Sequence, residues 1–590
     1  IMKLTFAQIG DGEIINLCHK DLFYVYRLLM MQSLHGDYTI PKRLKYWATK
    51  QPDATAFVYV AKDKPKAVLT SKEIYDLSME FGRHLLNIGV EPGSVVCSLI
   101  PDCPAALVAF FGILCAGCTV QNATIQMSDG TYLLQNLRKS KCRAVILSLN
   151  PDDRANRIIS QHFKTVSGNC VTSEKFPHLK NVIYTNLNLG TELGFIWQAG
   201  VKLTDNSNAE DLTIGTDDVA VIMPTSGTTG VSKLLPFSHA FLASAELCLR
   251  SISDSVHTQV SRISLFDEHS LTWAWGLPFW YTMSGDRTFL LDRRFKSDEG
   301  LDIRFVRDTI VRENCQIAKL SAASCLELTE LMQRESFGHA ASPLDTVLLA
   351  GQPLKRNILT VVGTLTKTVY NLYGGSEVGG VSLKKIDKES GFEDFNTGSL
   401  MEMVSVKIVD EDLKEVPTGS YGHVLVNKPD ICRYYVGDED DLMKSKFTDD
   451  GWFFTNDYGC LTAKGELIVQ GRFDDVIMRG MNYFHPSWIE NIIRGCTGVA
   501  DVLVVKVPDE ALLNEICACY ISEKGFDTCP QDVKNFCRRT FVTHDSNAKT
   551  ACPKYFLQMD SFPVNKNGKL DRKALEGKAT KLLNLLIVHQ

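Results

Sequence analysis

The most informative stretch of this sequence is a glycine-rich segment. It reads Pro224-Thr225-Ser226-Gly227-Thr228-Thr229-Gly230-Val231-Ser232-Lys233. The apolar run 219–223 before it and the apolar run 234–237 after it each predict a β-strand. A loop of this composition offers free backbone N–H groups, hydroxyl donors and a lysine charge, which together suit a phosphate group. We therefore expect phosphate binding between two strands, although a plain polar turn has a similar composition.

This segment differs from a Walker A loop, the best-known phosphate-binding loop. A Walker A loop places Gly directly before its Lys and Ser or Thr directly after it. Here Ser232 precedes Lys233 and Leu234 follows it. The sequence thus indicates another kind of phosphate loop.

The chain around this loop alternates short apolar runs with helical patterns. Strands are expected at 56–60 and 95–100, with an amphipathic helix at 72–88 between them. Further strands are expected at 143–149 and 182–185. Such βαβ alternation predicts an α/β fold with a largely parallel sheet.

The pattern changes after about residue 380, where short segments are separated by turn signals and predict antiparallel β-structure. A compact α/β pattern returns after about residue 474. We expect a large N-terminal α/β domain at 1–473, with a small β-barrel-like subdomain at 380–470. A small mobile α+β lid domain is expected at 474–590.

Composition narrows the class of protein. The 590 residues include 63 Lys and Arg against 69 Asp and Glu, a net charge of −6, so no nucleic-acid partner is expected. The 18 cysteines in a chain of this length suggest reduced, buried thiols. The apolar run 105–120 is too short to cross a bilayer and predicts a buried helix. We expect an intracellular, cytoplasmic protein without a targeting signal or transmembrane segment, as a monomer or homodimer.

The segment Thr225 to Lys233 resembles the phosphate loop of the adenylate-forming (ANL) superfamily. This superfamily includes acyl-CoA synthetases, peptide-synthetase adenylation domains and beetle luciferases. Its pattern is Ser/Thr-Ser-Gly-Thr-Thr-Gly-x-Pro-Lys-Gly, from which this chain departs at Ser232 and Leu234. Both departures fall at the trailing edge, so we expect altered loop dynamics rather than lost binding. The resemblance implies that ATP phosphates contact Thr225, Ser226, Gly227, Thr228, Thr229, Gly230 and Lys233.

Two further motifs resemble the adenine-binding and metal-binding parts of this superfamily. Residues 370–377 read Tyr-Asn-Leu-Tyr-Gly-Gly-Ser-Glu and are similar to its Tyr-Gly-x-Thr-Glu motif. The resemblance implies that Tyr373 and Gly374 lie by the adenine, that Ser376 contacts phosphate and that Glu377 holds Mg²⁺. A glutamate in a loop, taken alone, is more often a solvated surface charge. Upstream, a turn containing Gly351 and Gln352 resembles the turn that packs on the adenine.

Three more motifs follow in the superfamily's order. Thr455-Asn456-Asp457 resembles its Thr-Gly-Asp motif, which implies that Asp457 accepts hydrogen bonds from the ribose hydroxyls. The segment 471–477 resembles its hinge motif, which implies that Arg472 contacts the ribose or phosphate and that the lid rotates about Asp474. The loop after it, with Arg479 and Gly480, is similar to the loop that lines the thiol tunnel.

The last motif lies near the end of the chain. Residues 563–573 resemble the superfamily's Pro-x-Thr-x-x-Gly-Lys-x-x-Arg ending, which implies that Lys569 is the catalytic lysine. Adenylation builds negative charge on the α-phosphate, and a positioned ammonium group stabilises that charge.

The acid-binding end allows two alignments. Phe266-Asp267 resembles the Phe-Asp of amino-acid-activating domains, in which the aspartate pairs with the substrate's α-ammonium group. Alternatively, His269 corresponds to the catalytic-site histidine of acyl-CoA synthetases and luciferases. The spacing to Gly285 is 16 residues from His269 and 18 from Asp267, which favours His269. A satisfied histidine at the start of a helix remains the alternative without a function.

The resemblance implies an AMP-forming acid–thiol ligase. ATP and Mg²⁺ would activate a small carboxylic acid to an acyl-adenylate, and a thiol, CoA in the first instance, would take the acyl group. Alternatives are a stand-alone amino-acid-activating enzyme of the peptide-synthetase type and a luciferase-like adenylating oxygenase. A non-catalytic adenylate-binding homologue is a further alternative, because several motif positions depart from the pattern.

Overall fold

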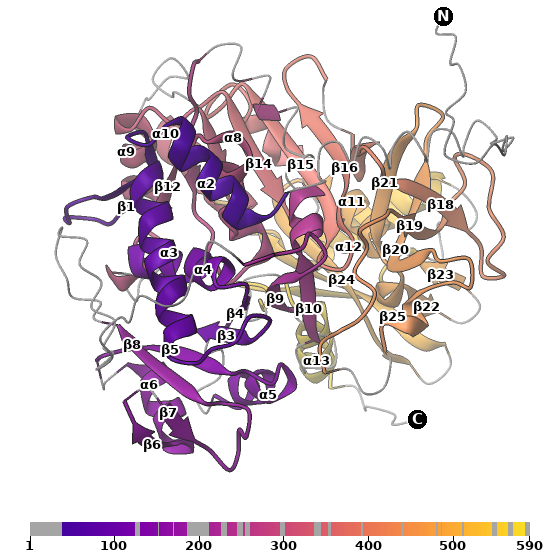
Figure 1. The fold of residues 1–590 in the computed structure, drawn as a ribbon. Coiled ribbons are helices and arrows are strands. Elements are labelled where there is room, and N and C mark those ends of the chain that lie inside the picture. The colour runs from indigo at the N-terminus through magenta and orange to yellow at the C-terminus, as the bar shows by residue number, and fades with distance from the viewer. Residues whose placement is uncertain are drawn as a thin grey trace, which may run out of the picture.

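Two large β-sheets with helices between them form most of the molecule, and a small unit follows at the C-terminal end (Figure 1). The computed structural model describes residues 38–123, 130–150, 153–168, 170–185, 212–225, 233–244, 252–253, 256, 260–295, 301–335, 344–351, 354, 356–390, 393–437, 442–479, 482–484, 486–509, 512–544, 551–564 and 570–584.

The thirteen-stranded sheet has a parallel part and an antiparallel part. In spatial order, the parallel part contains β1 (Thr55–Val60), β12 (Arg287–Leu291), β11 (Ser264–Asp267), β13 (Ile317–Lys319), β14 (Thr346–Ala350) and β15 (Thr368–Gly375). At one edge, β2 (Ala67–Thr70) pairs antiparallel with β1. Beyond β15, every pairing is antiparallel, through β16 (Gly379–Ile386), β17 (Asn396–Leu400), β21 (Glu466–Arg472), β20 (Phe453–Leu461), β19 (Gly422–Asn427) and β18 (Ser405–Val409).

The sequence therefore predicted a largely parallel sheet and the change to antiparallel strands near residue 380 correctly, and of these parallel strands it placed β1. The boundary between residues 473 and 474 and a separate subdomain at 380–470 stay predictions.

The eight-stranded sheet contains the two strands that flank the glycine-rich segment. Its spatial order is β10 (Lys233–Ser238), β9 (Val219–Thr225), β4 (Thr119–Asn122), β3 (Val95–Ser98), β5 (Ala144–Ser148), β8 (Asn181–Thr185), β7 (Cys170–Thr172) and β6 (Lys164–Ser167). The strands β9 and β10 pair antiparallel, with Thr225 opposite Lys233. The two predicted phosphate-loop residues at the ends of the segment are thus held as direct neighbours.

Two helices, α3 (Ser71–Asn87) and α4 (Pro104–Cys115), pack against strands of both sheets (Figure 1). Every residue of α4 is buried, as its uniformly apolar sequence predicts. The helices approach closely because Gly112 has no side chain: a Cβ atom there would lie 2.8 Å from the carbonyl oxygen of Ser78. Helix α3 starts with a capping box, in which Thr70 and Glu73 satisfy each other's backbone N–H groups.

The remaining helices of the large part lie around the two sheets. Among the described residues they are α2 (Ile40–Lys50), α5 (Thr131–Lys139), α6 (Arg154–Ile159), α8 (Phe279–Ser284), α9 (Ile303–Arg312) and α10 (Ala322–Arg334).

The C-terminal unit packs helices on both faces of a three-stranded sheet. Its elements are β22 (Ile477–Arg479), β23 (Asn482–Phe484), α11 (Pro486–Arg494), β24 (Val499–Asp509), β25 (Leu513–Ser522), α12 (Pro530–His544), β26 (Tyr555–Gln558) and α13 (Arg572–Leu582). Alternate residues of β24 face opposite sides, so Val502 and Val504 pack with α11 and α12, whereas Leu503 and Val505 pack with α13. This arrangement confirms the predicted small α+β unit.

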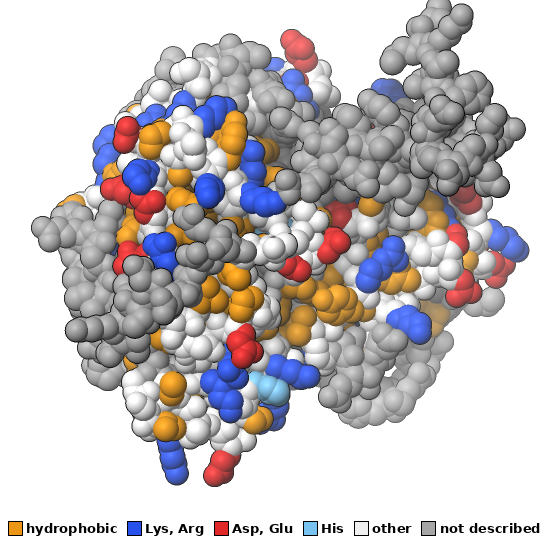
Figure 2. Space-filling view, viewed as in Figure 1, with side chains coloured by type: hydrophobic (Ala, Val, Ile, Leu, Met, Phe, Trp, Pro, Cys, Tyr) orange, Lys and Arg blue, Asp and Glu red, His pale blue; other side chains and the backbone are white. Residues whose placement is uncertain are grey.

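The described part of the face in Figure 2 carries Lys and Arg side chains interspersed with Asp and Glu. Among the described residues, no helix combines the length and the apolar character that crossing a membrane requires.

Candidate active site

The carboxyl ends of adjacent parallel strands bring the predicted site residues to one edge of the thirteen-stranded sheet. Asp267, the last residue of β11, lies opposite Lys319, the last residue of β13. Two strands further on, β15 ends at Tyr373 to Gly375, beside the end of β14. Ligands of open α/β sheets bind in the crevice outside the carboxyl ends of the strands. At about 4.8 Å per strand, β11 and β15 are separated by roughly 14 Å, which leaves room for a nucleotide beside an acid.

At the β15 end, Tyr373 and Asp457 are joined directly. The Tyr373 hydroxyl donates to Asp457 Oδ2 at 2.5 Å, and Arg472 Nε lies 3.2 Å from Asp457 Oδ1. Arg472 faces Asp457 because β20 and β21 pair these two residues. Burial raises the pKa of Asp457, and the Arg472 charge and the Tyr373 hydroxyl offset this rise only in part. The structure thus brings together three residues that the motifs placed 15 to 99 positions apart.

Asn456, just before Asp457 within β20, departs from regular strand geometry. Asn456 has a φ of +63°, in the left-handed region that glycine and asparagine tolerate best. The Thr455 hydroxyl accepts a hydrogen bond from the Asp457 N–H at 3.0 Å, and the Thr455 carbonyl accepts one from Arg472 at 2.7 Å. Asn456 therefore stands at the motif's glycine position in a left-handed backbone conformation within β20.

Glu377 lies in the turn between β15 and β16, next to Ser376, and two unpredicted residues contact it. The Tyr435 hydroxyl donates to Glu377 Oε1 at 2.9 Å, and Lys446 Nζ lies 3.5 Å from the same oxygen. Lys233 Nζ lies 5.1 Å from the centre of the Tyr435 ring. One end of the predicted phosphate loop is thereby placed near the predicted metal ligand. No sequence signal marks Tyr435 or Lys446, because both arrive through tertiary contacts.

The structure explains why glycine stands at two of the predicted site positions, Gly374 and Gly351. A Cβ atom on Gly374 would lie 2.1 Å from the carbonyl oxygen of Gly379, so only glycine lets β15 and β16 approach there. Gly351, at the end of β14, has a φ of +85°. At the phosphate loop, the Thr225 hydroxyl donates to the Lys233 carbonyl at 3.4 Å.

Several predicted site residues stand apart from this cluster or lie outside the described residues. Arg479 pairs with the buried Glu515 of β25 at 2.8 Å, within the C-terminal unit. Asp474 lies in a 3₁₀ turn at 473–475, but its side chain lies outside what the structure describes. Also outside the described residues are Ser226, Gly227, Thr228, Thr229, Gly230, Gln352, Gly480 and Lys569.

At the β11 end, Asp267 and His269 form a buried cluster with Lys319. Asp267 Oδ1 accepts hydrogen bonds from the His269 backbone N–H at 3.0 Å and from Nδ1 at 2.8 Å. Because a carboxylate only accepts, Nδ1 carries the proton. Lys319 Nζ donates to Asp267 Oδ2 at 2.5 Å. The structure thus brings the two alternative acid-site residues into one cluster, and it adds Lys319, which the sequence did not predict.

Unpartnered polar atoms surround this cluster. His269 Nε2 and Glu268 Oε2 are buried and have no hydrogen-bond partner among the described residues. Arg293 binds the Glu268 carbonyl at 2.6 Å and lies 3.2 Å from Asp102 Oδ2. Buried polar atoms without partners are costly, so they mark a place where a ligand can supply the missing hydrogen bonds.

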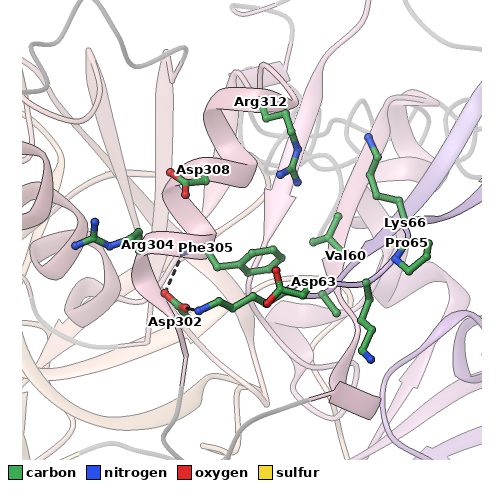
Figure 3. A pocket seen from close by; sticks show the side chains of 12 residues that line it. Val60, Asp63, Pro65, Lys66, Asp302, Arg304, Phe305, Asp308 and Arg312 are labelled. Carbon is green, nitrogen blue, oxygen red and sulfur yellow. Dashed lines mark hydrogen bonds and ion pairs between the residues drawn. The ribbon is translucent and has the colours of Figure 1, made fainter.

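A separate surface pocket of about 590 Å³ lies between the β1–β2 connection and α9 (Figure 3). Arg304 and Phe305 line one side, and Val60, Pro65 and Lys66 line the other. The pocket contains none of the predicted site residues. Its cations are largely paired, for example Lys62 with Asp302 at 2.8 Å, so the motif-bearing edge of the sheet remains the candidate active site.

The fold and this edge define an α/β nucleotide-binding enzyme. Its sequence matches the profile of the AMP-binding enzyme family over residues 44–436 and the profile of the AMP-binding enzyme C-terminal domain over residues 488–569. The chain therefore belongs to the AMP-binding enzyme family, as the adenylate-forming resemblance predicted.

Relatives and solved structures extend this likeness over nearly the whole chain. The chain is 24% identical to the "Putative acyl-CoA synthetase YngI" of Bacillus subtilis, over 94% of this chain and 99% of that protein. It is 23% identical to the mitochondrial medium-chain acyl-CoA ligase ACSF2 of Danio rerio, over 93% and 89%. Its fold is similar to that of ATP-bound MatB from Rhodopseudomonas palustris, with a TM-score of 0.74 at 20% identity, covering 92% of this chain and 99% of that chain.

Proposed function

We propose that this chain is an AMP-forming acid–thiol ligase of the acyl-CoA synthetase type. It couples a carboxylic acid to ATP, releasing pyrophosphate, and transfers the acyl group from the adenylate to the thiol of CoA, releasing AMP. The proposal rests most on one observation: the Tyr373–Asp457–Arg472 cluster and the Asp267–His269 cluster lie at the same edge of one sheet.

Different residues bind the ribose and the phosphates of the nucleotide. The ionised Asp457 accepts hydrogen bonds from the ribose hydroxyls, while Tyr373 fixes the carboxylate and stays a donor, because burial and the nearby Asp457 charge raise its pKa. Lys233 and Thr225 hold the phosphates at the mouth of the glycine-rich segment. The remaining loop residues, 226–230, are assigned to the phosphates by resemblance.

A magnesium ion fits this site as one bound mainly by phosphate oxygens. Among the described residues, no group of three or more His, Cys, Asp or Glu side chains is arranged to hold a metal. Mg²⁺ bound with a nucleotide commonly uses only one or two carboxylates. Glu377 offers one, since the hydrogen bond from Tyr435 engages only its Oε1. The ion would supply positive charge where the phosphates need it.

At the acid end, Asp267 holds the His269 ring in place. This leaves Nε2 as the ring atom available to the carboxyl group of the bound acid, to which it would donate with a proton of its own, because a carboxylate only accepts. Lys569 would stabilise the charge that develops on the α-phosphate. Closure of the C-terminal unit about Asp474 would bring Arg479 and Gly480 toward the thiol.

The test is a pyrophosphate-release screen of the purified chain over fatty, aromatic and amino acids, each with and without CoA. We expect acid-dependent release of pyrophosphate and formation of an acyl-CoA with at least one acid. Absence of release with every acid would overturn the proposal in favour of a non-catalytic adenylate-binding protein. Release with amino acids alone would favour the amino-acid-activating alternative.

Lys569→Ala separates adenylation from nucleotide binding. We expect acid-dependent pyrophosphate release to fall by at least about 100-fold, since one positioned charge contributes roughly 3 kcal/mol to such a transition state. ATP affinity, measured by calorimetry, should stay within about threefold of the wild type. Undiminished pyrophosphate release would remove Lys569 from the mechanism.

A further inference from the structure

At the carboxyl edge, Lys319 forms a buried ion pair with Asp267, and the proposed reaction gives this lysine no role. Asp267 and Lys319 have side-chain exposures of 3% and 5%. Lys319 Nζ also donates to the Trp275 carbonyl and lies 5.1 Å from the centre of the Trp275 ring. The two residues are 52 positions apart and meet because β11 and β13 pair in register.

Both carboxylate oxygens of Asp267 accept hydrogen bonds from protein groups. Two N–H groups of His269 bind Oδ1, and the Lys319 ammonium group binds Oδ2. Burial by itself would raise the pKa of Asp267, but the Lys319 charge and His269 outweigh it, and the pKa is lowered. Asp267 is therefore an ionised carboxylate whose counter-ion belongs to the protein.

We infer that Lys319 determines specificity by occupying the position at Asp267 that the ammonium group of an amino acid would take. This inference rests on the proposed function and names the substrate class: carboxylic acids without a cationic group beside the carboxyl carbon. A substrate ammonium group next to Lys319 would meet a like charge in a buried site, where such repulsion is strong. An acid without that group meets no such penalty and keeps His269 Nε2 as its contact.

Matched substrates that differ only in the α-ammonium group test this inference. We would measure kcat/KM for pyrophosphate release with octanoate against 2-aminooctanoate, and with 3-phenylpropanoate against phenylalanine. The wild type should prefer the unsubstituted acid. In Lys319→Met, the ratio of amino acid to unsubstituted acid should rise by at least 10-fold, because Asp267 then lacks an internal cation.

Lys428→Met is the matched control. Lys428 and Asp430 form another buried pair, with side-chain exposures of 5% and 8% and a distance of 3.3 Å, and neither residue belongs to the acid site. It should lower stability without changing the substrate ratio. An unchanged ratio in an active Lys319→Met variant would overturn the inference, as would an equal change in Lys428→Met.

A second measurement does not need turnover. In Lys319→Ala, n-butylammonium chloride should raise Tm by more than 2 °C beyond the same concentration of NaCl, since the amine replaces the missing side chain next to Asp267. The double variant Asp267→Asn/Lys319→Ala, which has no carboxylate there, should show no such difference. Equal shifts in both variants would overturn the inference. If the wild type releases no pyrophosphate with any acid, the proposed function fails, while this measurement still decides whether the carboxylate takes an ammonium group.

Discussion

Two aspartates at the candidate site, the buried Asp267 and the partly buried Asp457, differ in the partners of their carboxylates. Asp267 has a buried lysine as its partner, and its pKa is lowered. The side chain of Asp457 is 14% exposed, but its partner Arg472 is 58% exposed, and burial raises the pKa of Asp457. The Asp267 carboxylate therefore has its partners without a ligand, whereas the Asp457 carboxylate at the nucleotide end gains from further donors. Two ribose hydroxyls would supply such donors.

The largest expected effect is the difference in stability between the two ion pairs. Lys319→Met should lower the free energy of unfolding by about 3–5 kcal/mol, because it leaves a buried, ionised carboxylate alone. Arg472→Met should lower it by less than about 1 kcal/mol, because the partner charge is exposed to solvent. Urea unfolding of both variants measures the two values.

The double variant Asp267→Asn/Lys319→Met checks the cause of that effect. Removal of both charges should recover most of the lost stability, as replacement of whole buried ion pairs often does. A double variant as unstable as Lys319→Met would show that the lysine acts through packing instead. The contrast between the two ends would then lose its electrostatic basis.

The next largest effect is expected in nucleotide binding. Asp457→Asn should raise KM for ATP by roughly 30- to 100-fold, since a hydrogen bond to a charged group is worth about 1.5–3 kcal/mol and two ribose hydroxyls share this carboxylate. KM for the acid should stay within about twofold. Steady-state kinetics with ATP and the acid varied in turn measure the two KM values separately. An equal rise in both KM values would contradict the division of the site into a nucleotide end and an acid end.

The sequence motifs contain all three residues of the Tyr373–Asp457–Arg472 cluster but not Lys319, and the reason is physical; the roles of these residues stay predictions. Tyr373, Asp457 and Arg472 each stand in a short motif whose local spacing carries the information. Lys319 stands in the plain strand Ile317–Lys319, and only the register of β11 with β13 makes it a partner of Asp267.

The same limit applies to the fold. The helix α4 and the strands β9 and β10 follow from local apolar patterns, so the sequence predicted them. The order of thirteen strands in one sheet depends on pairings between distant segments, for which one sequence has no periodic signal. The contacts of Tyr435 and Lys446 with Glu377 were missed for the same reason.

The raised pKa of Asp457 predicts that nucleotide binding depends on pH. Only the ionised carboxylate accepts both ribose hydroxyls, so AMP affinity should rise as pH increases through the range above the ordinary carboxyl pKa of about 4. We expect AMP affinity to be higher at pH 7.5 than at pH 5, with proton release on binding, because binding favours the ionised carboxylate. Calorimetry in buffers of different ionisation enthalpy measures both quantities.

Asp457→Asn is the control for this pH dependence, since an amide does not titrate. Its AMP affinity should be weaker and should not change with pH over the same range.

The two aspartates should also have opposite effects on the pH dependence of the free energy of unfolding. Asp267, with a lowered pKa, stabilises the fold above its ordinary pKa and loses this contribution as pH falls. Asp457, with a raised pKa, favours the fold at lower pH and loses that contribution as pH rises.

The smallest expected effect concerns the left-handed backbone at Asn456, next to Asp457 in β20. Asn456→Ala should lower the free energy of unfolding by about 1 kcal/mol, because alanine tolerates a φ of +63° less well than asparagine does. Asn456→Gly should stay within about 0.5 kcal/mol of the wild type, since glycine adopts this conformation freely. If this left-handed backbone positions the Asp457 carboxylate, Asn456→Ala should also raise KM for ATP severalfold while Asn456→Gly does not. Equal KM values in the two variants would mean that β20 and β21 alone hold Asp457 in place.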